Sequence, residues 1–347
     1  MSLMAKMKKN SKLKGTEVLT DSKIFTKVSC ATDVPMLNVA LSGSLDGGLV
    51  SGLTVLAGES KHFKTSFALK MAAAYLIKHP DGILMFYDTE FGSPQSYFES
   101  FGIDTDRVLH SPVRNIEELK FDLISQLETI GRDDHVIIII DSIGNSASKK
   151  ELEDALSEKS VADMTRAKAL KGLFRMVTPY LTLNDIPMIA VNHIYKEIGL
   201  FPKSIVSGGT GIYYSSDNIW IIGRRQIKEG TEVTGYDFVI NIEKSRFLRE
   251  KVKIPITVSY DGGIEKYSGL LDTAMAGGFV IKPKNGWYQK IDVETGELIE
   301  KNYRKKDTDN AEFWDAILAS DKFNDFIKES FQLNGTNVNV EIVPAGE

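Results

Sequence analysis

One short segment of the chain combines a cation, a hydroxyl and a glycine at a spacing suited to phosphate chemistry. It consists of Gly58, Glu59, Ser60, Lys61, His62, Phe63, Lys64, Thr65 and Ser66. The spacing follows the phosphate-binding motif G-x-x-x-x-G-K-[ST], in which backbone N–H groups at a helix N-terminus surround phosphates. In that motif Lys64 supplies positive charge to the β- and γ-phosphates, and the Thr65 hydroxyl binds Mg²⁺. The segment therefore predicts a site for ATP and Mg²⁺, although a lysine-rich turn without a ligand also fits it.

The segment departs from the motif at Phe63, which stands where the second glycine is expected. A phenylalanine with positive φ costs about 1–2 kcal/mol, because its Cβ crowds the backbone in that region. We therefore expect either a negative φ at Phe63 or visible backbone strain.

Two acidic residues follow apolar strands and extend the site. Residues 136–140 are all apolar and lead into Asp141, which we expect to hold Mg²⁺ directly or through a water. Glu90 comes after the strand at residues 83–88, where its carboxylate can act as general base on the attacking water. Either acid alone could be an ordinary strand-end carboxylate. Both acids follow a phosphate-binding segment, and a βα unit separates that segment from Asp141. This order is more specific to a nucleotide site than either acid alone.

An α/β sheet is needed to position these residues, and from residue 52 to about residue 261 strand-like and helix-like segments alternate. The expected strands cover residues 53–57, 83–88, 108–111, 136–141, 188–192, 219–223, 238–243 and 254–260, and the expected helices cover residues 64–78, 115–131 and 161–183. The first five strands are near-continuous apolar runs, as in a parallel sheet covered on both faces, whereas the last one alternates like an antiparallel edge strand. The pattern predicts a mostly parallel twisted sheet with antiparallel edge strands.

Two connections are unusually long and follow strand ends where such sheets place ligands, at residues 142–160 and 193–211. Beyond residue 267 the pattern changes to a short helix, a turn at Asn285-Gly286 and a final helix that carries Phe313 and Phe326. We therefore divide the chain into an N-terminal arm (1–32), an α/β core (33–267) and a small C-terminal α/β subdomain (268–347).

Charge is unevenly distributed along the chain. The net charge is −5, yet residues 1–30 hold seven lysines against Glu17 and Asp21. This basic arm could contact phosphate, and a solvated terminus that aids solubility is an equal alternative. The single cysteine, Cys30, excludes an internal disulfide and favours a reducing cytosol. Because no apolar run approaches the roughly 18 residues of a membrane span and the first residues lack the apolar segment of a secretory signal, we expect a cytoplasmic protein without a membrane partner.

Taken together, these motifs resemble those of the RecA-type recombinases, and more narrowly those of the UvsX group of T4-type phages. The shared residues are Gly58, Lys64, Thr65, Glu90, Asp141-Ser142, Gly208-Gly209-Thr210-Gly211 and Lys244-Ser245-Arg246. The phage group also has the phenylalanine found here at Phe63, and the resemblance covers nearly the whole chain. It implies a RecA-like P-loop ATPase core.

The resemblance assigns further roles around the nucleotide. It implies that Glu90 is the catalytic base, that Tyr97 stacks on the adenine and that His193 senses the γ-phosphate. It also implies that Lys244 and Arg246 reach the ATP bound by a neighbouring subunit. The acidic adenine contact of bacterial relatives has no counterpart here, because Pro94 occupies its place.

The two long connections correspond to the DNA-binding loops of the family. The DNA contacts that this implies are Lys149, Lys150, Arg166, Lys168, Lys196, Phe201, Lys203, Gly208, Gly209 and Thr210. Lysines would release counterions from the DNA backbone, glycine N–H groups could approach phosphates, and an apolar ring could enter between bases. Residues 23–28 would form a polymerisation strand that joins the sheet edge of the next subunit.

The resemblance thus implies a DNA-dependent ATPase that forms helical filaments on single-stranded DNA, pairs it with double-stranded DNA and exchanges strands during replication and repair. Single-strand-binding and mediator proteins are the partners that we expect beside DNA. Two alternatives remain open at this stage: a hexameric DNA helicase with a RecA fold, and a non-catalytic, ATP-gated cover or mediator for single-stranded DNA.

Overall fold

The apolar runs expected as strands form one large sheet in the computed structural model, which describes residues 2–13, 15–157, 165–197, 199, 202–260, 262–333 and 340–341. The strands of this sheet are β2 (Gly52–Gly58), β3 (Ile83–Asp88), β4 (Val108–Pro112), β5 (Val136–Asp141), β6 (Pro187–Asn192), β9 (Asn218–Glu229), β10 (Glu232–Ser245), β11 (Lys253–Ser259) and β12 (Gly263–Ile264). Their order is β12-β11-β10-β9-β2-β6-β5-β3-β4. Pairing is parallel from β9 to β4 and antiparallel from β9 to β12, which confirms the expected fold class.

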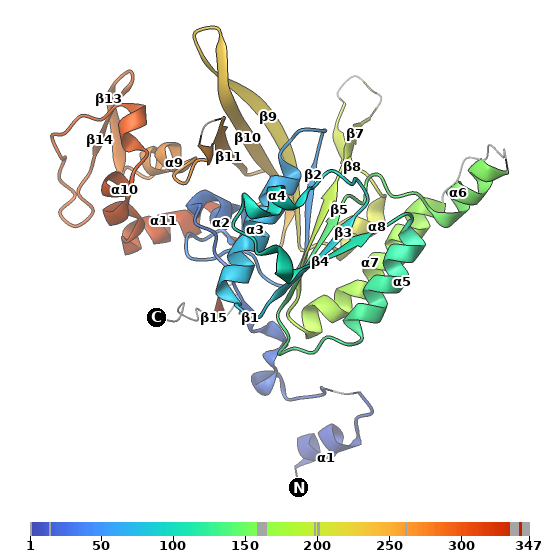
Figure 1. Cartoon of the computed structure of the whole chain (residues 1–347). Coiled ribbons are helices and arrows are strands. Elements are labelled where there is room, and N and C mark those ends of the chain that lie inside the picture. Colours follow the sequence, from blue (N-terminus) through green and yellow to red (C-terminus); the bar gives the residue numbers. More distant parts are fainter. Residues whose placement is uncertain are drawn as a thin grey trace.

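Alternation along the central strands explains why helices cover both faces. In β5, Ile137 and Ile139 belong to one buried cluster and Ile138 and Ile140 to another. Side chains of successive strand residues point to opposite faces, so an unbroken apolar run needs cover on both sides. The first cluster includes residues of α2 and α3, and the second includes residues of α5 and α7 (Figure 1).

Three of the helices in the arm and core, α3, α5 and α7, correspond to expected helices, and the others were not expected. They are α1 (Leu3–Asn10), α2 (Pro35–Ser42), α3 (Lys64–Lys78), α4 (Gln95–Glu99), α5 (Ile116–Leu127), α6 (Lys149–Leu156), α7 (Thr165–Leu183) and α8 (Thr210–Ser215), with short 3₁₀ turns at Leu19–Asp21, Lys23–Phe25 and Thr105–Arg107. Helix α3 has the predicted bounds. The Asn115 side chain caps α5 by accepting the Glu118 N–H at 2.9 Å. Of the helix expected at 161–183, residues 161–164 lie outside the described part.

Three expectations differ from the structure. Strand β4 is the last strand in the sheet order, and Leu109 and His110 on it are exposed, so its apolar residues do not mark a strand covered on both faces.

Residues 23–28 do not form one strand. Lys23–Phe25 is a 3₁₀ turn, and only β1 (Lys27–Val28) is extended, pairing in parallel with β15 (Val340–Glu341) of the same chain. Arg132 donates to the carbonyls of Lys23 and Thr26 and so holds this turn.

The third difference lies in the C-terminal subdomain, where the expected final helix is two helices. The elements there are α9 (Leu270–Ala276), β13 (Val280–Lys284), β14 (Trp287–Lys290), a 3₁₀ turn (Lys305–Thr308), α10 (Ala311–Leu318) and α11 (Asp321–Phe331). The break falls at Ser320, which is extended, and it lets the buried rings of Phe313 and Phe323 serve one cluster from two directions. The β13–β14 hairpin turns at Asn285-Gly286 as expected.

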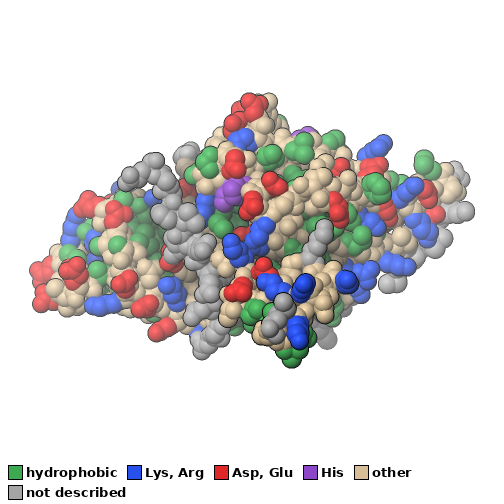
Figure 2. All heavy atoms as spheres, turned by 90° about the horizontal axis from the view of Figure 1, so that it is seen from below, with side chains coloured by type: hydrophobic (Ala, Val, Ile, Leu, Met, Phe, Trp, Pro, Cys, Tyr) green, Lys and Arg blue, Asp and Glu red, His purple; other side chains and the backbone are tan. Residues whose placement is uncertain are grey.

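The subdomain lies beyond the β10–β11 side of the sheet, and the β9–β10 hairpin projects past the core (Figure 1). On the face that Figure 2 shows, acidic and basic side chains are interspersed. Among the described residues no helix is both long and apolar enough to cross a membrane.

Candidate nucleotide site and DNA-facing loops

The phosphate loop, which we define as residues 58–65, connects β2 to α3. Lys64 is the first residue of α3, and its side chain turns back over the loop, donating to the carbonyls of Gly58 at 3.2 Å and Glu59 at 2.7 Å. The lysine is buried, and this burial lowers its pKa, while the carboxylates of Glu90 and Asp141 act in the opposite direction. A cation therefore lies at a helix N-terminus, in an arrangement suited to a triphosphate.

Phe63 has φ 60° and ψ 18°, so the expected negative φ is wrong and the alternative, backbone strain, holds. The left-handed conformation is the one that glycine adopts without cost at this place in the motif. The Phe63 ring stacks on Phe238 at 5.0 Å and meets Phe67 edge-on at 5.4 Å. Each aromatic pair contributes about 0.5–1.5 kcal/mol beyond the area it buries, which is comparable to the cost of the backbone conformation.

Thr65 and Asp141 form the candidate metal position. The Thr65 hydroxyl donates to one Asp141 oxygen at 2.7 Å, and the other oxygen, Oδ1, is buried without a hydrogen-bond partner. Burial raises the pKa of Asp141 to about 6. A buried carboxylate oxygen that lacks a donor fits a Mg²⁺ ion or an ion-bound water. The described residues contain no cluster of three or more His, Cys, Asp or Glu arranged for a metal, so phosphate oxygens and water would have to complete the coordination.

Glu90 lies at the centre of a hydrogen-bond network beside this position. One of its oxygens accepts from the Ser142 hydroxyl at 2.7 Å, from the Asn145 amide at 3.1 Å and from His193 Nε2 at 3.1 Å. These bonds favour the ionised form, and the pKa of Glu90 is lowered, chiefly by His193 and against the effect of burial. An ionised, oriented carboxylate can accept a proton from water.

Tyr97 lies next to the phosphate loop. Its hydroxyl is hydrogen-bonded to the hydroxyl of Ser66 in the first turn of α3, and its ring meets Phe101 edge-on at 5.5 Å. Tyr97 is therefore close enough to the phosphate loop to meet a bound nucleotide. Its contact with the adenine stays a prediction.

Lys244 and Arg246 lie beside the first half of β2, whereas the phosphate loop follows the end of that strand. In the sheet, Gly58 pairs with Ile222, whereas Lys244 pairs with Ile219, nearer the beginning of β2. The Lys244 ammonium donates to the carbonyls of Tyr213 and Ser216. Arg246 forms an ion pair with Asp217, although its side chain remains 61% exposed. Both cations thus lie where β10 ends, away from the strand end that carries the phosphate loop.

The first long connection contains helix α6, which the sequence pattern did not indicate. Its capping box pairs Ser148 with Glu151, and Lys149 lies 3.8 Å from Glu153 on the exposed helix surface. Lys150 similarly lies 3.9 Å from Asp154. Such exposed pairs contribute about 0–1 kcal/mol each, so they hold the two lysines only weakly.

Arg166 differs from the expectation of a DNA contact. Its guanidinium donates to the carbonyls of Ile143, Gly144 and Ser146 at 2.6–3.0 Å. These bonds use the side chain to hold the beginning of the first connection against α7, which is a structural role.

The second long connection contains a small hairpin of β7 (Ile194–Lys196) and β8 (Ser204–Val206). Lys196 pairs with Glu59 of the phosphate loop at 3.6 Å. Lys203 is exposed, and Gly208 and Gly209 have φ of 100° and 76°, which favour glycine. Thr210 begins α8. Phe201 lies outside the described residues.

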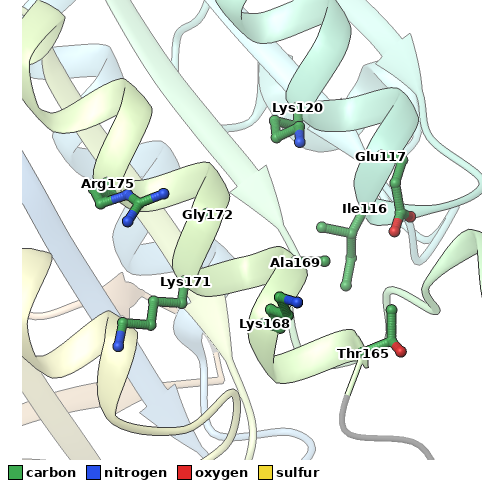
Figure 3. Close-up of a pocket in the computed structure, with 9 residues that line it drawn as sticks. All are labelled: Ile116, Glu117, Lys120, Thr165, Lys168, Ala169, Lys171, Gly172 and Arg175. Atoms are coloured by element: carbon green, nitrogen blue, oxygen red, sulfur yellow. The ribbon is translucent and has the colours of Figure 1, made fainter.

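A basic groove of about 550 Å³ lies between α5 and α7, next to the first connection (Figure 3). It is lined by Ile116, Glu117, Lys120, Thr165, Lys168, Ala169, Lys171, Gly172 and Arg175. Lys168 was an expected DNA contact, whereas Lys120, Lys171 and Arg175 were not. Lys171 and Arg175 could have been found from their helical spacing with Lys168, which places three cations on one face of α7, whereas Lys120 on α5 had no such signal.

Two protein families match this sequence. The RecA N-terminal domain family matches residues 6–265, and the family described as "Bacteriophage T4, Recombination and repair protein, C-terminal domain" matches residues 267–327. The chain is 50% identical to the Recombination and repair protein of Enterobacteria phage T4, over 99% of this chain and 89% of the phage protein. It is 27% identical to Protein RecA of Tropheryma whipplei, over 76% of this chain and 60% of that protein. Identity to Protein RecA of Clostridioides difficile is 26%, over 86% of this chain and 84% of that protein.

The buried carboxylate of Asp141 predicts a pH-dependent stability of the nucleotide-free chain. Its pKa is about 6 when folded, against about 3.9 for an aspartate in an unfolded chain. Protonation therefore favours the folded state, and this contribution is lost as the pH rises through 6. Asp141→Asn can still accept from Thr65, so we expect it to raise the free energy of unfolding by about 1–3 kcal/mol at pH 8, with a smaller gain near pH 4.

Urea unfolding without nucleotide at several pH values measures this difference. Asp106→Asn, at an exposed carboxylate, is the matched control and should show no such gain. Equal stability of Asp141→Asn and the unmodified chain at pH 8 would contradict the prediction.

Proposed function

The chain belongs to the RecA family of recombinases, and we propose that it uses ATP bound at the phosphate loop to drive filament formation and strand exchange on DNA. The observation that carries this proposal is the convergence of Lys64, Asp141 and Glu90 at one edge of the sheet, beside the loop. Lys64 lies at the N-terminus of α3, Asp141 accepts from Thr65, and Glu90 accepts from Ser142. The division of the chain at residues 33 and 268 stays part of the proposal.

The phosphate loop would bind the triphosphate through its backbone N–H groups and the Lys64 ammonium, which would exchange its present carbonyl partners for phosphate oxygens. Thr65 and Asp141 would hold Mg²⁺, which neutralises phosphate charge when bound. Occupation of the site would also supply the partner that Asp141 Oδ1 lacks. Tyr97 would provide an aromatic face for the adenine.

Glu90 would orient the attacking water and accept its proton. Ser142, Asn145 and His193 hold the carboxylate, so the proton acceptor keeps one direction through the reaction. His193 also immediately precedes the β7–β8 hairpin. A change in that hairpin on binding DNA can therefore reach Glu90 through one side chain, which supports DNA-dependent hydrolysis.

Lys244 and Arg246 would act on the triphosphate of a neighbouring subunit. Their place beside the first half of β2, away from the strand end that carries the phosphate loop, supports action between subunits, since two copies stacked head to tail can bring them to the next phosphate loop. Cations placed there stabilise the charge of the transition state and make hydrolysis depend on assembly.

DNA would contact the two long connections and the basic groove. Lys149, Lys150, Lys196 and Lys203 are exposed, and Lys168 lines the groove with Lys171 and Arg175. These cations suit the phosphate backbone rather than base edges, as pairing by complementarity requires. Gly208, Gly209 and Thr210 would offer N–H groups, and Phe201 keeps its expected stacking role as a prediction.

Membership of the RecA family also supports a proposal about partner proteins and the place of action. Single-strand-binding and mediator proteins are the further partners that we propose, with the host cytoplasm as the place of action. A ring helicase and a non-catalytic mediator are not favoured, because the match to a phage recombination and repair protein extends over 99% of the chain.

Hydrolysis of ATP should depend on single-stranded DNA and on Glu90. We expect single-stranded DNA to stimulate phosphate release at least tenfold, and Glu90→Gln to lower kcat by about 10²–10⁴-fold with nucleotide binding retained, because only the proton acceptor is lost. Lys64→Ala should abolish binding of a fluorescent ATP analogue. Hydrolysis that ignores DNA in the unmodified chain would remove the recombinase proposal.

Mixing two inactive variants tests the action between subunits. Arg246→Ala keeps its phosphate loop and Lys64→Ala keeps its cations, so each alone should show little DNA-stimulated hydrolysis. A random equimolar mixture would regain about one quarter of the unmodified activity, because that fraction of head-to-tail interfaces pairs an intact loop with an intact Arg246. Full activity of Arg246→Ala by itself would refute the role.

Salt dependence of DNA binding tests the groove. Removal of one phosphate contact by Lys171→Gln or Arg175→Gln should weaken binding to any sequence and reduce the slope of log K against log[salt] by about one. Fluorescence anisotropy with labelled oligothymidine between 50 and 300 mM salt, roughly the range in which such slopes are resolved, provides the measurement. Lys322→Gln, on the exposed surface of α11, serves as the control, and an unchanged slope for both groove variants would exclude the groove.

A further inference from the structure

Three consecutive residues of the phosphate loop are fastened to the β9–β10 pair. The Lys61 carbonyl accepts from Arg224 of β9 at 3.4 Å, and His62 Nδ1 donates to the Ile222 carbonyl at 2.7 Å. The Phe63 ring stacks on Phe238 of β10 with an angle of 22° between the rings. The loop is therefore held from the side by two strands that do not belong to the phosphate-binding motif.

The sheet register explains how these strands reach the loop. Gly58, the last residue of β2, lies beside Ile222, and Ile222 lies beside Ile240. Strand β9 continues past this point to Glu229, so the β9–β10 hairpin extends beyond the end of β2 and forms a wall next to the loop (Figure 1). Phe238 is two residues before Ile240 and faces the same side of the sheet.

The loop needs such a wall because two of its non-glycine residues adopt left-handed conformations. Lys61 and Phe63 have φ of 61° and 60°. Non-glycine residues keep such conformations only where the surrounding structure holds them. Phe63 meets this condition through its ring, which packs on Phe67 and Phe238, both almost completely buried.

We propose that Phe63, Phe238 and Arg224 form a brace that positions the phosphate loop for the triphosphate. Phe238 and Arg224 are positioning residues outside the motif, and Phe63 performs by packing the task that glycine performs by conformational freedom. The proposal builds on the proposed function, since it assumes that residues 58–65 bind nucleotide.

Restoring the glycine of the general motif gives the sharpest test. If Phe63 merely tolerates its conformation, Phe63→Gly should bind nucleotide at least as well as the unmodified chain. If the brace positions the loop, Phe63→Gly should weaken binding of a fluorescent ADP analogue with Mg²⁺ by about three- to tenfold, the range expected for a lost aromatic pair. The KM for ATP should rise by a similar factor.

A double-mutant cycle separates the brace from general loss of packing. Phe238→Leu keeps an apolar side chain at a buried position and should weaken binding about as much as Phe63→Gly. The double variant should then be no weaker than the worse single variant, since both remove the same contact. Arg224→Met, at the exposed end of the brace, should raise the KM about twofold without changing thermal stability.

The control for ring removal is Phe121→Leu, because Phe121 on α5 is 80% exposed. Unchanged or tighter nucleotide binding by Phe63→Gly, or losses that multiply in the double variant, would overturn the brace. Failure of the unmodified chain to bind the nucleotide would instead remove the proposed function, so the two failures are distinguishable.

Discussion

Parallel strands end together, and this constraint places the chemistry of the whole molecule. The carboxyl ends of β2, β3, β5 and β6 meet at one edge, where they carry the phosphate loop, Glu90, Asp141 and His193. Two charged groups at this end of the strands have no oppositely charged partner in hydrogen-bond contact. Asp141 is buried with one oxygen unpaired, and the Lys64 ammonium uses backbone carbonyls as temporary partners. A magnesium triphosphate would satisfy the cation and the carboxylate together, so binding energy can be used to order the loop.

The cations proposed to act between subunits lie toward the other end of these strands. Lys244 and Arg246 lie there, bound to carbonyls and to Asp217 at the junction of α8 and β9. If these cations act on the ATP of a neighbouring subunit, as we propose, the contact between copies is heterologous, because the phosphate loop and the cations lie on different parts of the surface. Because α8 also follows the second long connection, Lys244 and that connection are both attached to α8.

The sequence pattern predicted the central strands and α3 almost residue by residue, because continuous apolar runs and the proline after α3 are local signals. It could not predict the internal structure of the connections, where α6 and the β7–β8 hairpin form with few apolar residues. The resemblance to the family implied that Arg166 contacts DNA, whereas in the structure its guanidinium donates to three backbone carbonyls. The groove depends on α5 meeting α7, a contact between residues far apart in the chain. Lys171 and Arg175 could still have been found from their helical spacing with Lys168.

Phe63 shows why a motif is better understood as a set of physical requirements than as a set of residues. The loop requires a left-handed residue before Lys64, and glycine meets that requirement locally, at the expense of a flexible loop in the empty protein. Phenylalanine adopts the left-handed conformation because its ring packs on β10, a strand distant in sequence. The conformation of the loop then depends on tertiary contacts. Strand β10, which supports the ring at Phe238, ends at Lys244 and Ser245, next to Arg246. Strand β10 thus connects the phosphate loop to the cations expected to act on the nucleotide of the next subunit. A shift of β10 during assembly would therefore move residues at both places.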